Sequence, residues 1–323
     1  MPLDRSGVSP PAASDPPARP ASAERVGGLD ALRTLAVALV FVHHAWSLAG
    51  FDPYVHALGF PVGRVGTALF VALAGSLAAI STAPSPAEWL WRRLCRIYPA
   101  YWLVMLVVLV GVAWSGYKPI GPAQFISQML GLGLFTHPDR LVHVATWFVS
   151  LILLLYCLTA LAKRLGPDRE IAAALAAGCA AVPLLGVDVG YSAHASTYFA
   201  AYLAFRAPPS RRGVWLAAVT VAMALAAIYV WPVWSCGAIA VGLIGAAVAA
   251  PIDAPVFRQA SRYSYEFYLT NGPVLAALFA AAPRRPVLVS LIALLASAAL
   301  AVALHRATIG FSAPRRQAAP AIA

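Results

Sequence analysis

The 323-residue sequence is 61% hydrophobic and only 11% charged, with a mean hydropathy of +0.77. Soluble domains carry about 25% charged residues, so this composition excludes a water-soluble globular protein and predicts a polytopic membrane protein. The net charge of +11 is also found in nucleic-acid-binding proteins, but its distribution along this chain indicates membrane topology instead. The four cysteines are scattered and form no CxxC pair, which favours buried free thiols over disulfides or a metal site.

The two ends of the chain differ in composition from the rest. Residues 1–26 are rich in Pro, Ala, Ser and Arg and lack the apolar run of a signal peptide, so we expect a disordered cytoplasmic tail. Residues 307–323 predict a second cytoplasmic tail of the same kind. Residues 27–306 between them are expected to form one all-α transmembrane domain.

About ten segments of this domain are long and apolar enough, or nearly so, to cross a bilayer as helices. They are 29–50, 63–81, 98–114, 144–163, 169–187, 190–206, 213–231, 232–250, 264–282 and 286–306. The 190–206 segment is short and the 213–250 block needs a tight turn near Pro232, so a missed boundary there would change the count. A semi-apolar piece at 125–135 predicts a re-entrant or interfacial helix in an outer loop.

The basic residues predict the orientation of these helices. With the N-terminus inside and ten alternating spans, 18 of the 23 Lys and Arg residues fall on the cytoplasmic side. This excess satisfies the positive-inside rule, and an odd number of spans would break it in one half of the chain. We therefore expect both termini in the cytoplasm.

The first predicted helix carries an ionisable pair on one face. Residues eleven apart lie nearly on one face of an α-helix, so Arg33 and His44 share a stripe, separated by about 16 Å along the axis. His43 points away from this stripe and is expected to pack. An ionisable side chain at such depth usually marks function, and His44 could act as a general base. The alternative is a neutral histidine bonded to a backbone carbonyl or a serine. Three further histidines, at 137, 143 and 194, lie near outer helix ends and could contact a substrate.

A second basic element lies at the inner end of the third predicted helix, where Arg92, Arg93 and Arg96 crowd together. Arg93 and Arg96 are spaced i, i+3 and share a face. These arginines could simply anchor the cytoplasmic side, or their guanidinium groups could bind a ligand with several phosphates, such as coenzyme A. Glu266 is the carboxylate closest to being intramembrane, and this scarcity of acids argues against a proton-coupled transporter.

Five segments together resemble the acyltransferase 3 family of integral membrane acyltransferases. GLDALRTLAVALVFVHHA resembles the family's first helix, with its Arg and, eleven positions on, its His at Arg33 and His44. The other four matches follow in the family's order. They are VGTALFVALAGSLA at 65–78, the Arg-x-x-Arg element at Arg93 and Arg96, the fourth-helix motif at Trp147, Ser150 and Tyr156, and the ninth-helix element with Ser264, Tyr268 and Asn271.

The resemblance implies an enzyme that transfers an acyl group, usually acetyl, from cytoplasmic acyl-CoA to a hydroxyl of a cell-envelope or exported carbohydrate. It implies His44 as general base, Arg33 as its partner or a coenzyme A contact, and Arg93 and Arg96, with Arg92 beside them, as phosphate ligands. Acyl-CoA is then a donor substrate, with no permanently bound cofactor and no metal. The expected location is the bacterial plasma (inner) membrane, with the lipid bilayer and the carbohydrate acceptor as partners and no nucleic acid.

Three positions depart from the family pattern. Ala68 replaces an acidic residue, Ile152 and Leu153 replace a Glu pair, and Asn271 replaces a His of the ninth-helix element. Asn can form hydrogen bonds but cannot take a proton. A catalytically weak relative, a non-enzymatic carrier or flippase of a lipid-linked sugar, and a membrane anchor without a site therefore stay open as alternatives.

Overall fold

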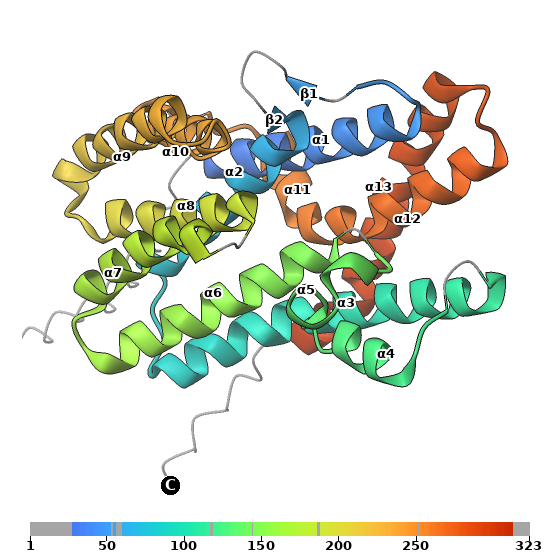
Figure 1. Ribbon diagram of the computed structural model, residues 1–323, viewed down its shortest axis with the longest axis horizontal. Coiled ribbons are helices and arrows are strands. Elements are labelled where there is room, and N and C mark those ends of the chain that lie inside the picture. The colour runs from blue at the N-terminus through green and yellow to red at the C-terminus, as the bar shows by residue number, and fades with distance from the viewer. Residues whose placement is uncertain are drawn as a thin grey trace, which may run out of the picture.

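The computed structural model describes residues 28–312, with gaps at 53, 56–59, 117–118, 144, 186–187 and 251. The described residues are all-helical apart from a short antiparallel ladder of β1 (Tyr54–Val55) and β2 (Phe60–Pro61) (Figure 1). The predicted tail at 1–26 lies outside the described residues. The last helix continues to Ser312, beyond the end expected at 306.

Each of the ten predicted segments overlaps one long helix. These are α1 (Leu29–Leu48), α2 (Val62–Ile80), α3 (Pro86–Ser115), α6 (Thr146–Leu165), α7 (Asp168–Ala181), α8 (Val189–Arg206), α9 (Pro209–Tyr229), α10 (Trp234–Ala249), α12 (Ser264–Ala281) and α13 (Pro286–Ser312). Shorter elements lie between them: α4 (Pro122–Met129), α5 (Gly133–Thr136), α11 (Pro255–Arg262) and the 3₁₀ turns η2 (Pro138–Arg140) and η3 (Val182–Leu185).

Within the described residues, six helices are long and apolar enough to cross a membrane, namely α1, α2, α3, α6, α9 and α13. The helices α7 and α10 are shorter, with 14 and 16 residues. The helices α8 and α12 have 18 residues each but carry more polar side chains. The protein is thus a helical membrane protein, while the count of ten spans and the cytoplasmic position of both termini stay predictions.

The third long helix begins much earlier than the predicted start at residue 98. The hydroxyl of Ser85 accepts a hydrogen bond from the backbone N–H of Glu88, and Pro86 occupies the first turn. Hydropathy alone places the start too late, because charged side chains interrupt the apolar run although the helix continues through them. Pro99 consequently lies inside α3, and the predicted arginines lie on the helix rather than before it.

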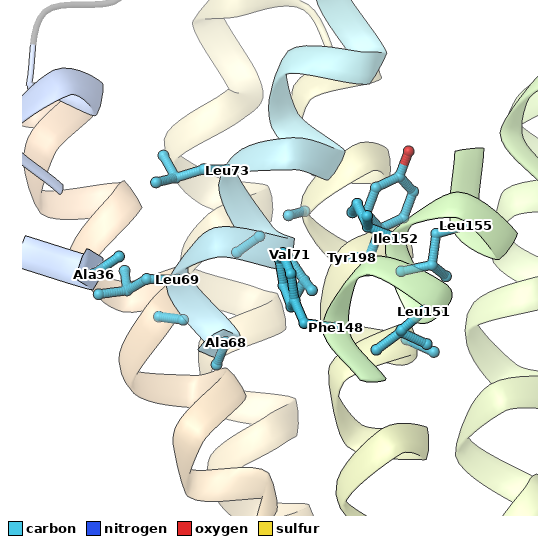
Figure 2. Packing of buried hydrophobic residues seen from close by; sticks show 14 of the residues in the cluster. Ala36, Ala68, Leu69, Val71, Leu73, Phe148, Leu151, Ile152, Leu155 and Tyr198 are labelled. Carbon is cyan, nitrogen blue, oxygen red and sulfur yellow. The ribbon is translucent and has the colours of Figure 1, made fainter. Parts of the chain in front are cut away.

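The core is organised around α2. Figure 2 shows α2 side chains packed between Ala36 of α1 on one side and side chains of α6 on the other. Small residues permit this central position: a methyl group on Gly66 would lie 2.6 Å from the carbonyl oxygen of Ala36. A methyl group on Gly75 would collide with the carbonyl oxygen of Tyr198 on α8. The helices α1 and α8 therefore approach α2 at backbone distance.

These contacts also fix the helix directions and give the bundle two chemically different ends. Gly63 at the start of α2 meets His43 near the end of α1, so these helices are antiparallel. Gly190 at the start of α8 lies beside Arg64, so α2 and α8 run the same way. We call the end with the C-terminus of α1 and the N-termini of α2, α6 and α8 the histidine end. The opposite end, with the N-termini of α1 and α3, is the arginine end.

The predicted re-entrant segment is helical and folds back along α3. Tyr98 and Trp102 of α3 donate hydrogen bonds to the carbonyls of Leu130 and Met129, at 2.8 and 2.9 Å. Tyr98 and Ser115 are separated by about 25 Å along the helix axis. The end of α4 and the residues after it therefore lie beside the middle of α3, and whether this segment is re-entrant or interfacial stays a prediction.

Candidate active site

His44 is held by Asn271 at the histidine end. The His44 Nδ1 and Asn271 Oδ1 atoms are 2.9 Å apart. Asn271 is fully buried, and its amide nitrogen donates to the carbonyls of Phe267 and Tyr268 at 3.0 and 2.8 Å. Because the amide nitrogen is committed to these carbonyls, Oδ1 is the acceptor and His44 donates from Nδ1–H. The imidazole is thereby held in the tautomer whose Nε2 carries a lone pair.

The ring of His44 lines a cavity of about 310 Å³, here called the histidine cavity. The end of α1, the starts of α2, α6 and α8, and Tyr268 of α12 form its walls. Nε2 of His44 has no hydrogen-bond partner among the described residues. The cavity therefore offers a basic nitrogen to a bound ligand.

The cavity walls combine aromatic and polar groups. Trp147 stacks on His194 with ring centres 5.8 Å apart, and the Nε2 atom of His194 lies 3.4 Å from the hydroxyl of Thr67. Arg64 and Asp188 also line the cavity. Sequence reasoning missed these two charged residues because they lie in separate helix starts and share no spacing.

His43 is closer to the site than its position on the helix face suggests. Its ring packs against Gly63 of α2, as expected for a packing residue, but it also lines the histidine cavity. Its centre lies 5.5 Å from that of His44. Both histidines therefore line the same cavity.

The other predicted histidines have different environments. His194 lines the cavity, whereas His137 contacts Thr136 and Ser127 in the outer segment. His143 is buried, donates from Nε2 to the carbonyl of Leu269 at 2.7 Å and accepts at Nδ1 from the N–H of Ala145 at 2.9 Å. Burial lowers the pKa of His143 to about 4, although its bond to Leu269 opposes this shift. His143 is therefore a neutral structural group with both ring nitrogens occupied.

The arginine end gathers several cations around Arg33. Arg33 forms an ion pair with Asp30 at 3.6 Å. The charges of Arg96 and Arg93 also act on Arg33. Arg96 is exposed and forms no ion pair with any described residue. A cluster of this kind, with more cations than carboxylates, attracts an anionic ligand.

Arg93 is oriented by aromatic rings. Its guanidinium lies 5.3 Å from the ring centre of Trp89 and 5.7 Å from that of Tyr156, and it donates to the hydroxyl of Ser81 at 3.0 Å. The ammonium of Lys163, near the end of α6, lies 5.2 Å from the centre of the same Trp89 ring. No spacing in the sequence indicates Lys163, because its partner Trp89 lies far away in the chain.

Arg92 is paired with an acid on its own helix. It forms an ion pair with Glu88 one helical turn earlier, and both side chains are exposed. Arg92 also lies one turn before Arg96, so this ion pair does not separate it from the other arginines. Its predicted place among the phosphate ligands stays a prediction.

The remaining residues of the family motifs have separate positions. Trp147 and Tyr268 line the histidine cavity, and Tyr156 lies at the arginine end. Ser150 donates to the carbonyl of Thr146 and accepts from the N–H of Leu134, so it joins α5 to α6. Ser264 donates to the carbonyl of Ser261 at 2.9 Å and supports the turn between α11 and α12.

Glu266 lies outside the histidine cavity, and the described residues form no metal site. Glu266 is buried and its carboxylate lies 2.8 Å from Nδ1 of His305, where it links α12 to α13. Neither side chain lines the histidine cavity. In the described part of the chain, no three His, Cys, Asp or Glu side chains come together as a metal site.

Comparison with known proteins identifies the family. Neither the curated proteins nor the solved structures give a significant match to the chain. A family model described as an acyltransferase domain matches residues 26–306. This range includes every element of the two ends described above. The chain therefore belongs to the acyltransferase 3 family of membrane acyltransferases.

Proposed function

We propose that this membrane acyltransferase moves an acyl group, usually acetyl, from cytoplasmic acyl-CoA to a hydroxyl of a cell-envelope or exported carbohydrate. The observation that carries the proposal is the hydrogen bond between His44 and Asn271 beside the histidine cavity. This bond leaves Nε2 as a proton acceptor at the place where a ligand hydroxyl can bind. A histidine of this kind suits general base catalysis near neutral pH.

The proposed reaction is a direct transfer. Nε2 of His44 takes the hydroxyl proton of the acceptor while the acceptor oxygen forms a bond to the thioester carbonyl carbon. The carbon–sulfur bond then breaks, and the coenzyme A sulfur takes the proton from the imidazolium. Asn271 Oδ1 continues to accept from Nδ1–H, which stabilises the imidazolium and keeps the ring in position. The products are the acyl ester and free coenzyme A.

The arginine end is the proposed donor site. Arg33, Arg93 and Arg96 present guanidinium groups that match phosphate oxygens with parallel hydrogen bonds. Arg33 and His44 are separated by about 16 Å along α1, and an extended pantetheine arm is long enough to cover such a distance. The arginines would then bind the phosphates while the thioester reaches the histidine.

The proposed setting is the bacterial plasma (inner) membrane, with the arginine end and both termini on the cytoplasmic side. The excess of cytoplasmic basic residues supports this orientation. Acyl-CoA is made in the cytoplasm, which favours a donor site there. The histidine end would then face the outer leaflet, where a cell-envelope carbohydrate can reach it.

The proposal is tested by replacing His44 with Ala in purified protein in lipid nanodiscs. Release of free coenzyme A thiol from acetyl-CoA is measured in the presence of an envelope carbohydrate extract. We expect His44→Ala to lower the rate by about a hundredfold or more, because a general base contributes that much. The matched control is His137→Ala in the outer segment, which should retain the parental rate.

The outcome also separates the alternatives. A carrier would move its sugar without acyl-CoA and release no thiol, and a membrane anchor would do neither. A parental protein that releases no thiol, or a folded His44→Ala variant with the parental rate, would contradict the proposal. Thermal melting of both variants checks that they fold.

A further inference from the structure

Part of the wall of the histidine cavity is aromatic. Trp147 is half-buried, and its ring centre lies 5.8 Å from His194 at an interplanar angle of 23°. Tyr191 adds a third ring, 5.5 Å from Trp147. All three side chains line the cavity. Stacked rings form a flat, rigid surface against which an apolar ligand face can pack.

Beside this wall lie two groups of opposite charge. Asp188 caps α8, because its Oδ1 accepts hydrogen bonds from Gly190 N–H at 2.8 Å and Tyr191 N–H at 3.3 Å. Asp188 is exposed, so the cavity reaches the surface there. Arg64 has no ion-pair partner within 4.0 Å among the described residues. A donor fork and an acceptor are therefore both available to a ligand.

The residue between these charged groups is glycine. A methyl group on Gly190 would lie 2.7 Å from Nη1 of Arg64 and 2.8 Å from Oδ1 of Asp188. Any side chain here would displace both groups or fill the space between them. Gly190 thus keeps this corner of the cavity open.

We propose that this wall is the subsite for a neutral saccharide ring, and this assignment rests on the proposed function. A sugar ring has an apolar C–H face, which suits Trp147, and a rim of hydroxyls, which suits paired donors and acceptors. Arg64 donates and Asp188 accepts, so together they can bind neighbouring hydroxyls. Their opposite charges largely cancel, which favours a neutral ring over an acidic one.

The size and position of the subsite match this ligand. Ligand pockets span about 300–1,000 Å³, and a cavity of about 310 Å³ suits one end of a longer molecule. A ring stacked on Trp147 lies in the same cavity as His44 and can direct one hydroxyl towards Nε2. The rest of a longer chain would leave past the exposed Asp188.

The subsite is tested by saturation-transfer NMR on the full chain in nanodiscs. The probes are methyl glucoside, methyl mannoside and methyl galactoside, compared with methyl glucuronide and hexane-1,6-diol. We expect transfer to ring protons of a neutral glycoside, at least threefold stronger than to the glucuronide or the diol. Trp147→Leu should reduce this transfer at least fivefold.

Two further variants make the test specific. Asp188→Asn keeps an oxygen for the helix cap but loses the charge, and it should also weaken the transfer. The matched control is Trp114→Leu, since Trp114 is 91% exposed on α3 and should leave the transfer unchanged. Thermal melting checks that each variant folds. If Trp147→Leu does not fold, Asp188→Asn alone tests the subsite.

Absence of transfer to every neutral glycoside, transfer that persists in both subsite variants, or stronger transfer to the glucuronide or the diol would overturn the subsite. Thiol release from acetyl-CoA in the same preparation reports separately on the proposed function. Thiol release that depends on His44, without saccharide binding, overturns the subsite alone. Saccharide binding without any thiol release overturns the acyl transfer alone.

Discussion

At the scale of single residues, the orientation of His44 depends on one buried amide. The imidazole could rotate or change tautomer if Nδ1 had no fixed acceptor, and Nε2 would then lose its direction. Asn271 prevents this because its own amide nitrogen is held by two carbonyls of α12. Asn271 cannot exchange a proton, but it can orient the histidine that we propose as the general base.

This role predicts the effect of replacing Asn271. Asn271→Leu keeps the volume but removes the acceptor, and we expect kcat for acyl transfer to fall about tenfold or more while KM for acyl-CoA stays within about twofold. Asn271→Gln retains both the acceptor oxygen and an amide N–H donor and should recover most of the rate. Steady-state thiol release measures both. Equal loss in the two variants, or a rise in KM instead, would contradict a positioning role.

At the scale of elements, α2 is the helix on which the others are assembled. It contacts α1, α8 and α10, and 72% of its most apolar 18-residue stretch is buried inside the protein. In a membrane, close helix packing depends on small residues because lipid offers no hydrophobic driving force between helices. Gly66 and Gly75 supply this closeness on two sides of α2. The positions of His43 and Arg64 therefore depend on packing elsewhere in the helix.

A substitution at Gly66 tests this dependence. Gly66→Leu places a side chain against the backbone of α1, and overpacking of this kind costs about 1–3 kcal/mol. We expect a lower melting temperature in detergent and a lower yield of monodisperse protein. Gly111→Leu on α3 is the matched control, because nothing lies within 4 Å of a methyl group there. Equal melting temperatures for the two variants would contradict the packing role of Gly66.

At the scale of the whole molecule, the two ends of the bundle divide the chemistry. Cations without enough carboxylate partners gather at the arginine end, whereas the histidine end has histidines, aromatic rings, one arginine and one aspartate. The helix α1 connects the two ends, with Arg33 at the arginine end and His44 at the histidine end. Such a division suits a reaction whose donor and acceptor arrive from opposite sides of a membrane.

The donor end predicts a separate kinetic effect. Replacing both Arg93 and Arg96 with Gln removes charged hydrogen bonds worth about 1.5–3 kcal/mol each. We expect KM for acyl-CoA to rise at least tenfold with a smaller change in kcat. Arg285→Gln is the control, because Arg285 is exposed in the turn between α12 and α13. The phosphate assignment fails if the double variant and the control have the same KM.

Much of the fold could be predicted from the sequence because membrane helices are set by local composition. Each predicted apolar segment overlaps a helix. The early start of α3 was missed because charged residues interrupt the apolar pattern there. The site was less predictable. His44 and Arg33 stood out as ionisable residues in an apolar helix, but Asp188 and Lys163 are ordinary charged residues at helix ends.

The sequence by itself determined the membrane class, the family and the presence of Arg33 and His44 on one apolar helix. Hydropathy, charge distribution and motif order are properties of the chain and need no tertiary contacts. Only the tertiary structure decided which side chains meet. Asn271 lies 227 residues from His44, and Arg64 reaches the cavity wall through the parallel packing of α2 and α8. The physical reason is that a hydrogen bond or a cavity depends on distances between helices, and helix packing sets those distances through contacts far apart in the chain.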